Sequence, residues 1–557
     1  KDMDMWGEQP GVTLDGDGRV VTLNISGFGA RGFVPDAIGQ LTELKILYLG
    51  NHNELLGGFD HSSVLMSANS NGRIDAMDYY TKVLLRDARE DLSAELKNVI
   101  NRDAEQHPII SSRIELKDMA FGNLTSDIRG ISRAMMRLTE LEQFFIANCP
   151  ITADNFFVDV EESSEFYDQR DEWSWANMTM LTDIEIYNCS KLTRLPMEFL
   201  AGLPAVQSLN ISANKAISGE QLKADWEAII DSPMGSTLQI LYLGYNNLRE
   251  TPSYDYLKRM PKLGLLDCTN NALERIHPFG KEVTPTKLYY DFNKIESVKA
   301  ADDGYFCGLS QLEEFSVRNN RLTVLPDLFT ARSVYTIVSA NFSNNQISSL
   351  ENGAAWRGVN TETLNLSNNR FEELPSEIMA SGSIVGTLML SGNGMRRIAA
   401  GALTGRNSEY LTTIDLSYNR LTELPYDDFS ITNIPFLYGL DLSSNAFAEF
   451  PYAPLSVDRL TVMSIRQQRD DEGNRTLREW PTGLSTCPRL TAFYIGSNDL
   501  GKIEDTISPY ILLFEIKDNP NISIDLSAVC PYIEMGYYEL IYDSTQDIRG
   551  CDALNLD

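Results

Sequence analysis

A pattern of leucines closed by an asparagine recurs along most of this chain and constrains its fold more than any other feature. One copy is LTTIDLSYNRLTELP at residues 411–425, where Ile414 and Leu416 alternate with polar residues before Asn419. Alternation with a period of two predicts a short strand with one buried face. The alternation spans only the middle of the copy, so the chain must leave the strand near the asparagine and turn back.

The asparagine position marks each copy and sets the period. Between Asn320 and Asn445, successive asparagines stand 24 to 26 residues apart. Gln468 continues the series, and Cys149 and Cys189 occupy the same position upstream. The asparagines that we assign to this structural ladder are Asn214, Asn246, Asn271, Asn293, Asn320, Asn345, Asn369, Asn393, Asn419, Asn445, Asn498 and Asn519.

An amide at the bend has a physical role. Where the chain leaves the strand, backbone donors and acceptors lose their ladder partners, and a buried group without a partner costs about 1–3 kcal/mol. The asparagine side chain carries an acceptor and two donor hydrogens on a short arm, so it can satisfy these groups in the interior. Cys149 and Cys189 would act as small, buried, weak donors. We therefore expect each copy, called a rung below, to stack on the next.

The pattern resembles that of the leucine-rich repeat family, whose period is about 20 to 29 residues. The resemblance covers most of the chain. It implies an α/β solenoid, a curved right-handed superhelix with a parallel sheet on its concave side and irregular chain on its convex side. Prolines such as Pro375 and Pro425 in the returning segments favour extended irregular chain over helix.

Two insertions and two atypical ends interrupt the period. After the second rung, Leu92, Leu96, Val99 and Ile100 have the spacing of an amphipathic helix. This helical insertion is either an elaborated loop packed on the solenoid or a partner-binding subdomain. A second insertion, acidic and aromatic, is interpreted as a solvated helix rather than a site. The predicted organisation is an N-terminal cap with the first two rungs at 1–52, a mainly helical insertion at 53–137, leucine-rich repeats at 138–525 with the acidic insertion at 152–180, and a C-terminal cap at 526–557.

Segments outside the repeat resemble a set of surface leucine-rich repeat proteins from gut Bacteroidales. These segments are the start around Trp6, the helical insertion, REWP at residues 478–481, and CPYIEMGYYELIYDSTQDIRGCDAL at residues 530–554. The resemblance implies export and lipid anchoring through an N-terminal segment, which KDMDMWGEQP does not contain. It implies an extracellular or cell-surface location, but it supplies no molecular function and no ligand residue.

Composition restricts the partners. With 47 Lys and Arg against 78 Asp and Glu, the formal net charge is −31, so the chain repels nucleic acid and anionic lipid. We expect no nucleic acid partner, and membrane contact only through a lost N-terminal anchor. Seven cysteines are too few for a disulfide-built scaffold. Cys530 and Cys551 either form a disulfide in the C-terminal cap, which implies an oxidising compartment, or remain two buried thiols.

No catalytic constellation stands out from the sequence. The four histidines are His52, His61, His107 and His277, and no metal-binding or nucleophile motif accompanies them. His52 stands at the asparagine position of a rung, which favours a structural role. We therefore expect no enzyme activity, no cofactor and no metal ion.

The concave face is the predicted binding surface, because the fold lines up exposed residues there in columns. One column on the C-terminal half is a hydroxyl ladder of Ser343, Ser367, Ser391, Ser417 and Ser443. On the N-terminal half, aromatic residues and their acidic neighbours are candidates for partner contact, since aromatics are enriched at binding hot spots. These candidates are Phe145, Tyr187, Tyr242, Tyr245, Tyr289, Phe292, Glu185, Asp267 and Asp291. The alternative is that the aromatics pack on one another and on the insertion loops.

Together these features predict a non-enzymatic recognition protein, secreted or on the cell surface, that we expect to be monomeric. A preorganised sheet loses little entropy on binding, so modest contacts suffice. The partner would be a protein with a basic surface or a glycan that stacks on the tyrosines. The alternatives are a structural or self-assembling surface protein with an apolar convex or flank patch, and an enzyme with its site in the 53–137 insertion.

Overall fold

The computed structural model of the chain forms two compact units, unit 1 (Lys1–Glu314) and unit 2 (Phe315–Asp557), and each is described by itself. The structure describes residues 11–52, 124–279, 283–298, 312–327, 337–356, 358–380, 383–405, 408–484, 487 and 489–555. Most of the expected helical insertion, at 53–123, lies outside the described residues, as do His61 and His107.

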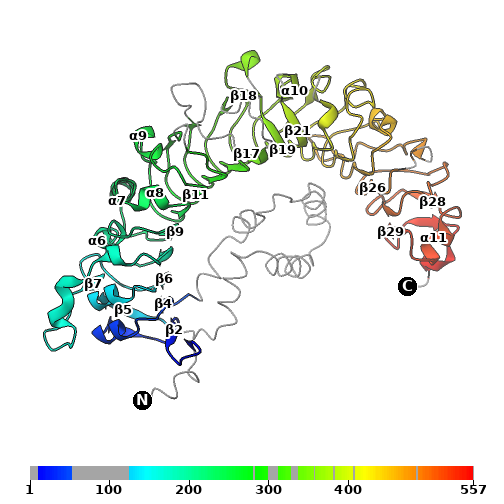
Figure 1. The fold of residues 1–557 in the computed structure, drawn as a ribbon. Helices are drawn as coiled ribbons and strands as arrows, with labels where there is room; N and C mark the ends of the chain where they lie inside the picture. Colours follow the sequence, from blue (N-terminus) through cyan, green and yellow to red (C-terminus); the bar gives the residue numbers. More distant parts are fainter. Residues whose placement is uncertain are drawn as a thin grey trace. The chain divides into compact units, whose positions relative to one another are not determined.

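In unit 1, one short strand from each rung joins a parallel sheet (Figure 1). The strand order follows the chain, because each rung pairs with the next from β2 to β13. Strand β1 pairs antiparallel with β2. The strands are β1 (Val12–Leu14), β2 (Val20–Asn24), β4 (Ile46–Gly50), β6 (Gln143–Ala147), β8 (Asp183–Tyr187), β9 (Ser208–Asn210), β10 (Ile240–Tyr242), β11 (Leu265–Asp267) and β13 (Lys287–Tyr289).

Unit 2 repeats this arrangement. Its strands also pair in parallel in chain order, from β17 to β29. Strand β15 (Glu314–Ser316) lies at the boundary of the two units. The strands are β17 (Ile337–Asn341), β19 (Asn360–Asn365), β21 (Ile384–Met389), β23 (Thr413–Asp415), β24 (Gly439–Asp441), β25 (Val462–Ser464), β26 (Ala492–Tyr494), β27 (Leu513–Glu515) and β29 (Glu539–Ile541).

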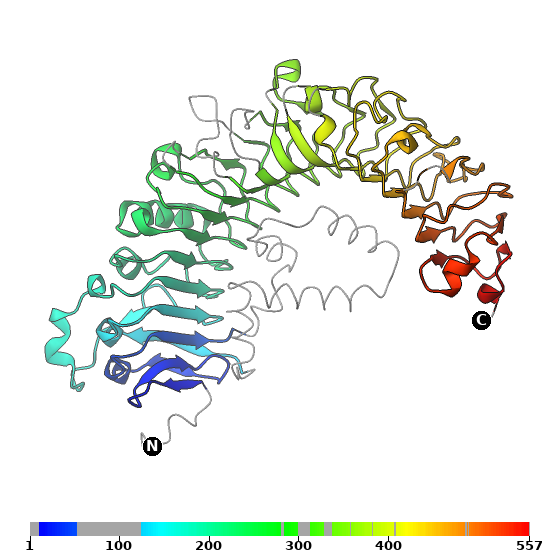
Figure 2. The same ribbon diagram turned by 45° about the vertical axis from the view of Figure 1, so that its right-hand side comes forward.

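Helices of unit 1 lie on the opposite side of the core from the sheet (Figures 1 and 2). The longest is α7, which begins after Ser218, whose hydroxyl accepts the N–H of Gln221 at 3.2 Å. Leu222, Trp226 and Ile229 are buried on one face of α7, as helical spacing requires. These helices are α6 (Met197–Leu200), α7 (Gly219–Asp231), α8 (Met234–Thr237) and α9 (Tyr254–Leu257).

Shorter elements fill the remaining returns. The small strands pair in parallel within neighbouring rungs: β3 (Arg31–Val34) with β5 (Asp127–Ser132) and β7 (Phe157–Val158), β12 (Arg275–Ile276) with β14 (Ser297–Val298), β16 (Val324–Leu325) with β18 (Ser349–Leu350), β20 (Glu373–Leu374) with β22 (Arg397–Ile398), and β28 (Ser523–Asp525) with β30 (Asp547–Arg549). The short helices are η2 (Asp36–Gln40), η3 (Arg133–Arg137), η4 (Tyr167–Glu172), η5 (Trp175–Asn177), η7 (Gly353–Ala355), α10 (Glu377–Ala380), η8 (Ser408–Tyr410), η9 (Ala453–Ser456), α11 (Cys530–Glu534) and η11 (Asp552–Asn555).

Leucines and asparagines of successive rungs make up the core. Leu411, Ile414 and Leu421 of one rung are at most 1% exposed. Asn419 donates through Nδ2 to the carbonyl oxygens of Leu416 in its own rung (2.9 Å) and Leu390 in the preceding rung (3.0 Å). Its Oδ1 accepts the N–H of Met395 in the preceding rung at 3.0 Å.

The same contacts recur along the ladder. Nδ2 donates to a carbonyl oxygen three residues earlier at Asn214, Asn246, Asn271, Asn293, Asn320, Asn345, Asn369, Asn393, Asn445, Asn498 and Asn519. Cys149 and Cys189 are buried there, and their Sγ atoms lie 3.4 and 3.7 Å from the carbonyl oxygens of Ala147 and Tyr187. These cysteines are weaker donors than an amide.

The residue before each asparagine of the ladder, and before Cys149, Cys189 and Gln468, has a left-handed backbone, a feature that the sequence pattern did not predict. Its φ is 53° at Tyr418, 59° at Tyr245 and 54° at Phe292. Asparagine and glycine tolerate this conformation, whereas a bulky side chain adopts it at a cost. The other residues of this column are Asn148, Asn188, Ala213, Asn270, Asn319, Asn344, Asn368, Gly392, Ser444, Gln467, Ser497 and Asp518.

Three segments differ from the boundaries that the sequence suggested. The insertion drawn to residue 137 ends earlier, because β5 and η3 belong to a rung. The acidic insertion at 152–180 contains β7 and the 3-10 turns η4 and η5 in place of one helix. Pairing with β27 brings β29 into the sheet of unit 2, although it lies within the expected C-terminal cap. Cys530 and Cys551 form a disulfide in that cap.

No helix within the described ranges combines the length and the apolar character that crossing a membrane requires.

Candidate functional site

The register of unit 1 brings the nine candidate residues into three neighbouring columns on the strand face, defined here as the side of the sheet that points away from the core. The second column holds Tyr187 and Asp291, and the third holds Tyr245 and Phe292. The first column, one residue per strand from β4 to β13, reads Tyr48, Phe145, Glu185, Asn210, Tyr242, Asp267 and Tyr289.

Asp267 has a local role that the sequence analysis missed. Its Oδ1 accepts the backbone N–H of Thr269 at 2.8 Å, at the point where β11 ends. Burial raises the pKa of the Asp267 carboxyl, and the bonds from Thr269 oppose that shift. The signal was present as a repeated tripeptide of Asp or Asn, an apolar residue, and Ser or Thr. The same bond recurs in the pairs Asn24 and Ser26, Asn210 and Ser212, Asn341 and Ser343, Asn365 and Ser367, Asp415 and Ser417, Asp441 and Ser443, and Asp525 and Ser527.

Glu185 belongs to a buried polar network that crosses several rungs. Its Oε2 accepts from Asn210 Nδ2 at 2.7 Å, and its Oε1 lies 3.5 Å from His52 Nε2. His52 Nδ1 lies 2.8 Å from Ser26 Oγ, which also accepts the backbone N–H of His52. This order of serine, histidine and glutamate is not a hydrolase triad that substrate can reach, since Ser26 is completely buried. The network is structural, as the ladder position of His52 suggested.

Tyr289 is held by a buried ion pair. Its hydroxyl donates to Glu314, whose other oxygen accepts from Lys287 Nζ at 2.7 Å. The side chains of Lys287 and Glu314 are 8% and 9% exposed. Burial raises the pKa of Glu314 although Lys287 lowers it, and burial together with the Glu314 charge raises the pKa of Tyr289. Tyr289 is therefore part of the packed sheet and offers little surface to a partner.

The remaining aromatic candidates pack against small residues and each other. Phe145 and Tyr48 have ring centroids 4.9 Å apart. Tyr187 is buried with Ala147 and Ala213, and Tyr245 packs against this cluster. Phe145, Tyr242, Tyr245 and Phe292 are partly exposed, whereas Tyr187 and Asp291 are buried. Tyr48, Glu185, Tyr187, Tyr242, Tyr245, Asp291 and Phe292 also take part in further interactions within the chain.

In unit 2 the predicted hydroxyl ladder is internally hydrogen-bonded. Ser391 Oγ and Ser417 Oγ are 2.8 Å apart, and Ser443 Oγ and Ser464 Oγ are 2.6 Å apart. Ser343 Oγ donates to Asn341 Oδ1 at 2.7 Å. Ser343, Ser367, Ser417 and Ser443 are buried, so these hydroxyls offer little surface to a partner.

A second polar cluster lies on the strand face of unit 2. Ser464, Tyr494 and Glu515 are aligned on β25, β26 and β27. Arg466 lies with its guanidinium carbon 5.2 Å from the Tyr494 ring centroid and its Nε 3.6 Å from Glu515 Oε2. Burial raises the pKa of Glu515, and the charge of Arg466 opposes that shift. No sequence motif marked this cluster, because its members come from three separate segments of the chain.

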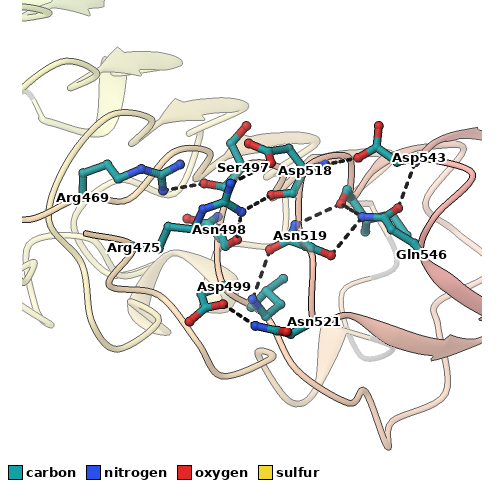
Figure 3. A network of polar contacts seen from close by, with 12 residues as sticks. Arg469, Arg475, Ser497, Asn498, Asp499, Asp518, Asn519, Asn521, Asp543 and Gln546 are labelled. Carbon is teal, nitrogen blue, oxygen red and sulfur yellow. Dashed lines mark hydrogen bonds and ion pairs between the residues drawn. The ribbon is translucent and has the colours of Figure 1, made fainter. Parts of the chain in front are cut away.

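A network beside this cluster secures the ends of the last strands (Figure 3). Arg475 Nη1 donates to the carbonyl oxygens of Asn498 (2.7 Å) and Asp518 (2.6 Å), and Arg469 Nη1 donates to that of Ser497 at 2.6 Å. Ser497 and Asp518 are in the left-handed column, so both arginines hold strained bends. Burial lowers the pKa of Arg469, and the like charge of Arg475 adds to this shift.

Among the residues that the structure describes, no group of three or more His, Cys, Asp or Glu side chains is arranged to hold a metal ion. Burial raises the pKa of the Cys149 thiol to about 11, so this cysteine is not a reactive nucleophile at neutral pH.

Comparison with known proteins gives a consistent result. A family model described as Leucine Rich Repeat matches residues 360–381 and 410–430. The crystal structure of a leucine-rich repeat protein from Bacteroides eggerthii is 40% identical with a TM-score of 0.80, and the match covers all of this chain and 92% of that chain. A leucine-rich repeat protein from Bacteroides thetaiotaomicron is 42% identical with a TM-score of 0.81, and the match covers all of this chain and 68% of that chain.

A curated human protein, Leucine-rich repeats and immunoglobulin-like domains protein 1, matches a shorter stretch. It is 32% identical over 169 residues, which is 30% of this chain. The chain spans only 15% of the length of that protein.

Proposed function

Because the chain belongs to the leucine-rich repeat proteins, we propose that it is a non-catalytic recognition protein that binds a partner protein through the strand face of unit 1. Proteins with this fold generally bind other proteins and typically have no catalytic activity. In this proposal the chain acts outside the cell or at the cell surface. The Cys530–Cys551 disulfide supports that location, since disulfides persist in oxidising compartments.

The observation that carries the proposal is the first column of the strand face. Register places Tyr48, Phe145 and Tyr242 on strands of one sheet, with Glu185 and Asn210 between them. Tyrosine and phenylalanine supply large contact area with few rotatable bonds, which is why aromatics are enriched at protein interfaces. Phe145 and Tyr242 are partly exposed, so part of each side chain can contact a partner.

The rigid setting of these rings supports binding with little loss of entropy. The Ser26–His52–Glu185–Asn210 network, which includes two residues between these rings, and the Lys287–Glu314 pair further along the sheet fix the strands before any partner arrives. A preorganised surface pays less conformational entropy on association than a flexible loop does. The Asp267 and Tyr289 contacts are internal, so the proposed contacts centre on Phe145 and Tyr242.

The test starts from partner identification with the full chain as bait among secreted and surface proteins. The affinity of a captured partner is then measured for wild type and for the Phe145→Ala/Tyr242→Ala variant. Loss of two hot-spot aromatics should weaken binding by at least about 30-fold. Tyr410→Ala, at a 48% exposed tyrosine of unit 2, is the matched control. Unchanged affinity of the double variant, with its thermal unfolding intact, would disprove the proposal.

A further inference from the structure

We propose that Arg466, Tyr494 and Glu515 form a binding site for a neutral carbohydrate, which docks a pair of adjacent hydroxyl groups between the guanidinium and the carboxylate. This site lies in unit 2, outside the residues to which the protein-binding proposal assigns contacts. Its test is therefore independent of that proposal.

A glycine creates the geometry of the site. Gly496 follows Tyr494 on the next outward position, and a Cβ at Gly496 would lie 2.8 Å from the Lys517 carbonyl oxygen and 3.0 Å from Glu515 Oε1. Only glycine therefore leaves room for the Glu515 carboxylate to lie against β26. Arg466 comes from the neighbouring rung and reaches toward the same carboxylate.

The charged pair is not arranged as a stabilising ion pair. Arg466 Nε and Glu515 Oε2 are 3.6 Å apart, beyond hydrogen-bond distance, whereas arginine and carboxylate groups paired for stability are commonly bidentate at 2.7–2.9 Å. Arg466 Nε instead makes a long 3.4 Å contact with Ser464 Oγ. Their side chains are only 14% and 12% exposed, so water reaches them poorly.

Hydrogen-bonding capacity therefore remains in the cluster. Among the residues that the structure describes, Glu515 Oε2 is buried without a hydrogen-bond partner. Within the same residues, the terminal nitrogens of Arg466 donate no hydrogen bond, because its contacts are those of Nε and the Tyr494 ring. A buried acceptor and a fork of donors left open side by side call for a ligand that supplies both complements.

The chemistry of that ligand follows from the pair. Arg466 and Glu515 together carry no net charge, so an added carboxylate would be repelled by Glu515 and an added ammonium by Arg466. A hydroxyl group can donate and accept at once, so two adjacent hydroxyls can donate to Oε2 and accept from Arg466. The partly exposed Tyr494 ring provides the flat apolar face on which a sugar ring can rest.

The experiment uses the full chain on an array of neutral oligosaccharides, matching uronic-acid oligosaccharides and peptides, followed by calorimetric titration with the neutral oligosaccharide that binds best. Glu515→Gln and Arg466→Met should each weaken binding at least about tenfold, the value of one hydrogen bond to a charged group. Tyr494→Phe should retain binding, and Tyr494→Leu should lose it. Wild type should show no specific binding to a derivative of the oligosaccharide in which one hydroxyl of the bound pair is methylated.

Arg459→Met is the matched control, because Arg459 lies 4.6 Å from the Phe436 ring on an exposed part of unit 2 away from this cluster. It should leave carbohydrate binding unchanged. Urea unfolding of each variant checks folding, and the isosteric Glu515→Gln keeps the test valid if Arg466→Met fails to fold. The proposal is overturned if no neutral oligosaccharide binds, if uronic acids or peptides bind in preference, or if Glu515→Gln binds as wild type does.

Discussion

Asp267 Oδ1 accepts the backbone N–H of Thr269 two residues further along at 2.8 Å, and this bond ends strand β11. Seven other rungs or caps make the same bond with Asp or Asn followed by Ser. The acidic residue on the strand face is therefore explained by the backbone it satisfies. A carboxylate in this position also carries a desolvation cost, because burial raises the pKa of Asp267 above 3.8.

Replacing Asp267 with asparagine should stabilise unit 1 at neutral pH. The amide oxygen keeps the bond to Thr269, and the folded state no longer has to bury a charge. The pKa of Asp267 is raised in the folded state, so the cost of burying its charge is fully present above that pKa and absent below about pH 3.8. The stability gained by Asp267→Asn should therefore vanish as the pH falls. Urea midpoints of Asp267→Asn and wild type between pH 3 and 8 measure this.

Asp267→Ala provides the contrast for this test. It also removes the charge, but it leaves the Thr269 N–H without its partner, at a cost of about 1 kcal/mol. If Asp267→Asn and Asp267→Ala had equal midpoints at pH 7, the bond to Thr269 would have no role in stability.

The Lys287–Glu314 pair should be far more costly to break than an exposed pair. Lys287→Met leaves the Glu314 charge buried beside Tyr289, which should destabilise unit 1 by about 3–5 kcal/mol. The matched control is Lys45→Met, since Lys45 and Glu142 are 2.8 Å apart but 50% and 39% exposed. That exposed pair should contribute less than about 1 kcal/mol.

A compensating change tests the cause of that effect. Glu314→Gln in the Lys287→Met background removes the unpaired charge and should recover most of the lost stability in urea unfolding. Equal stability of the single and double variants would show that packing of Lys287, and not the Glu314 charge, explains the loss.

The sequence predicted the repeating architecture because its signals are local and repeated. Alternation at Ile414 and Leu416 and the amide at Asn419 describe one rung, and each rung sees nearly the same neighbours. The Arg466 cluster could not be predicted in this way. Arg466, Tyr494 and Glu515 each come from a different rung. They can lie close together because Gly496 has no side chain.

For the outward residues of the strand face, the sequence pattern indicated which side of the sheet they occupy but not their contacts within the chain. The pattern placed Asp267 and Tyr289 on that face, yet it could not distinguish a ligand contact from a bond to the chain itself. Distinguishing the two requires knowing that Glu314 in the next rung carries the acceptor for Tyr289, and that Thr269 presents its N–H to Asp267.

Two substitutions at Gln467, in the left-handed column, should change the stability of unit 2 in opposite directions. Gln467 has a φ of 55° and an exposed side chain. Gln467→Asn keeps an amide and suits this conformation, so it should raise the stability of unit 2 by about 0.5–1 kcal/mol. Gln467→Val should lower it, because a β-branched residue is strongly disfavoured there. Thermal unfolding of both variants measures these changes, and a valine variant more stable than wild type would contradict the backbone argument.

The asparagine ladder is tested most directly at Asn419, whose amide joins three stretches of backbone. Asn419→Ala removes the donors to the carbonyl oxygens of Leu390 and Leu416 and the acceptor for the Met395 N–H, so the destabilisation should exceed the about 1–3 kcal/mol of one buried orphan. Asn419→Cys should cost less than alanine, because cysteine occupies this position at Cys149 and Cys189. Hydrogen exchange should show the Met395 amide losing protection in both variants. Asn433→Ala, which removes only an exposed bond to the Asp427 carbonyl, should stay within about 0.5 kcal/mol of wild type. A comparable loss at Asn433 and Asn419 would mean that the buried amides do not join the rungs.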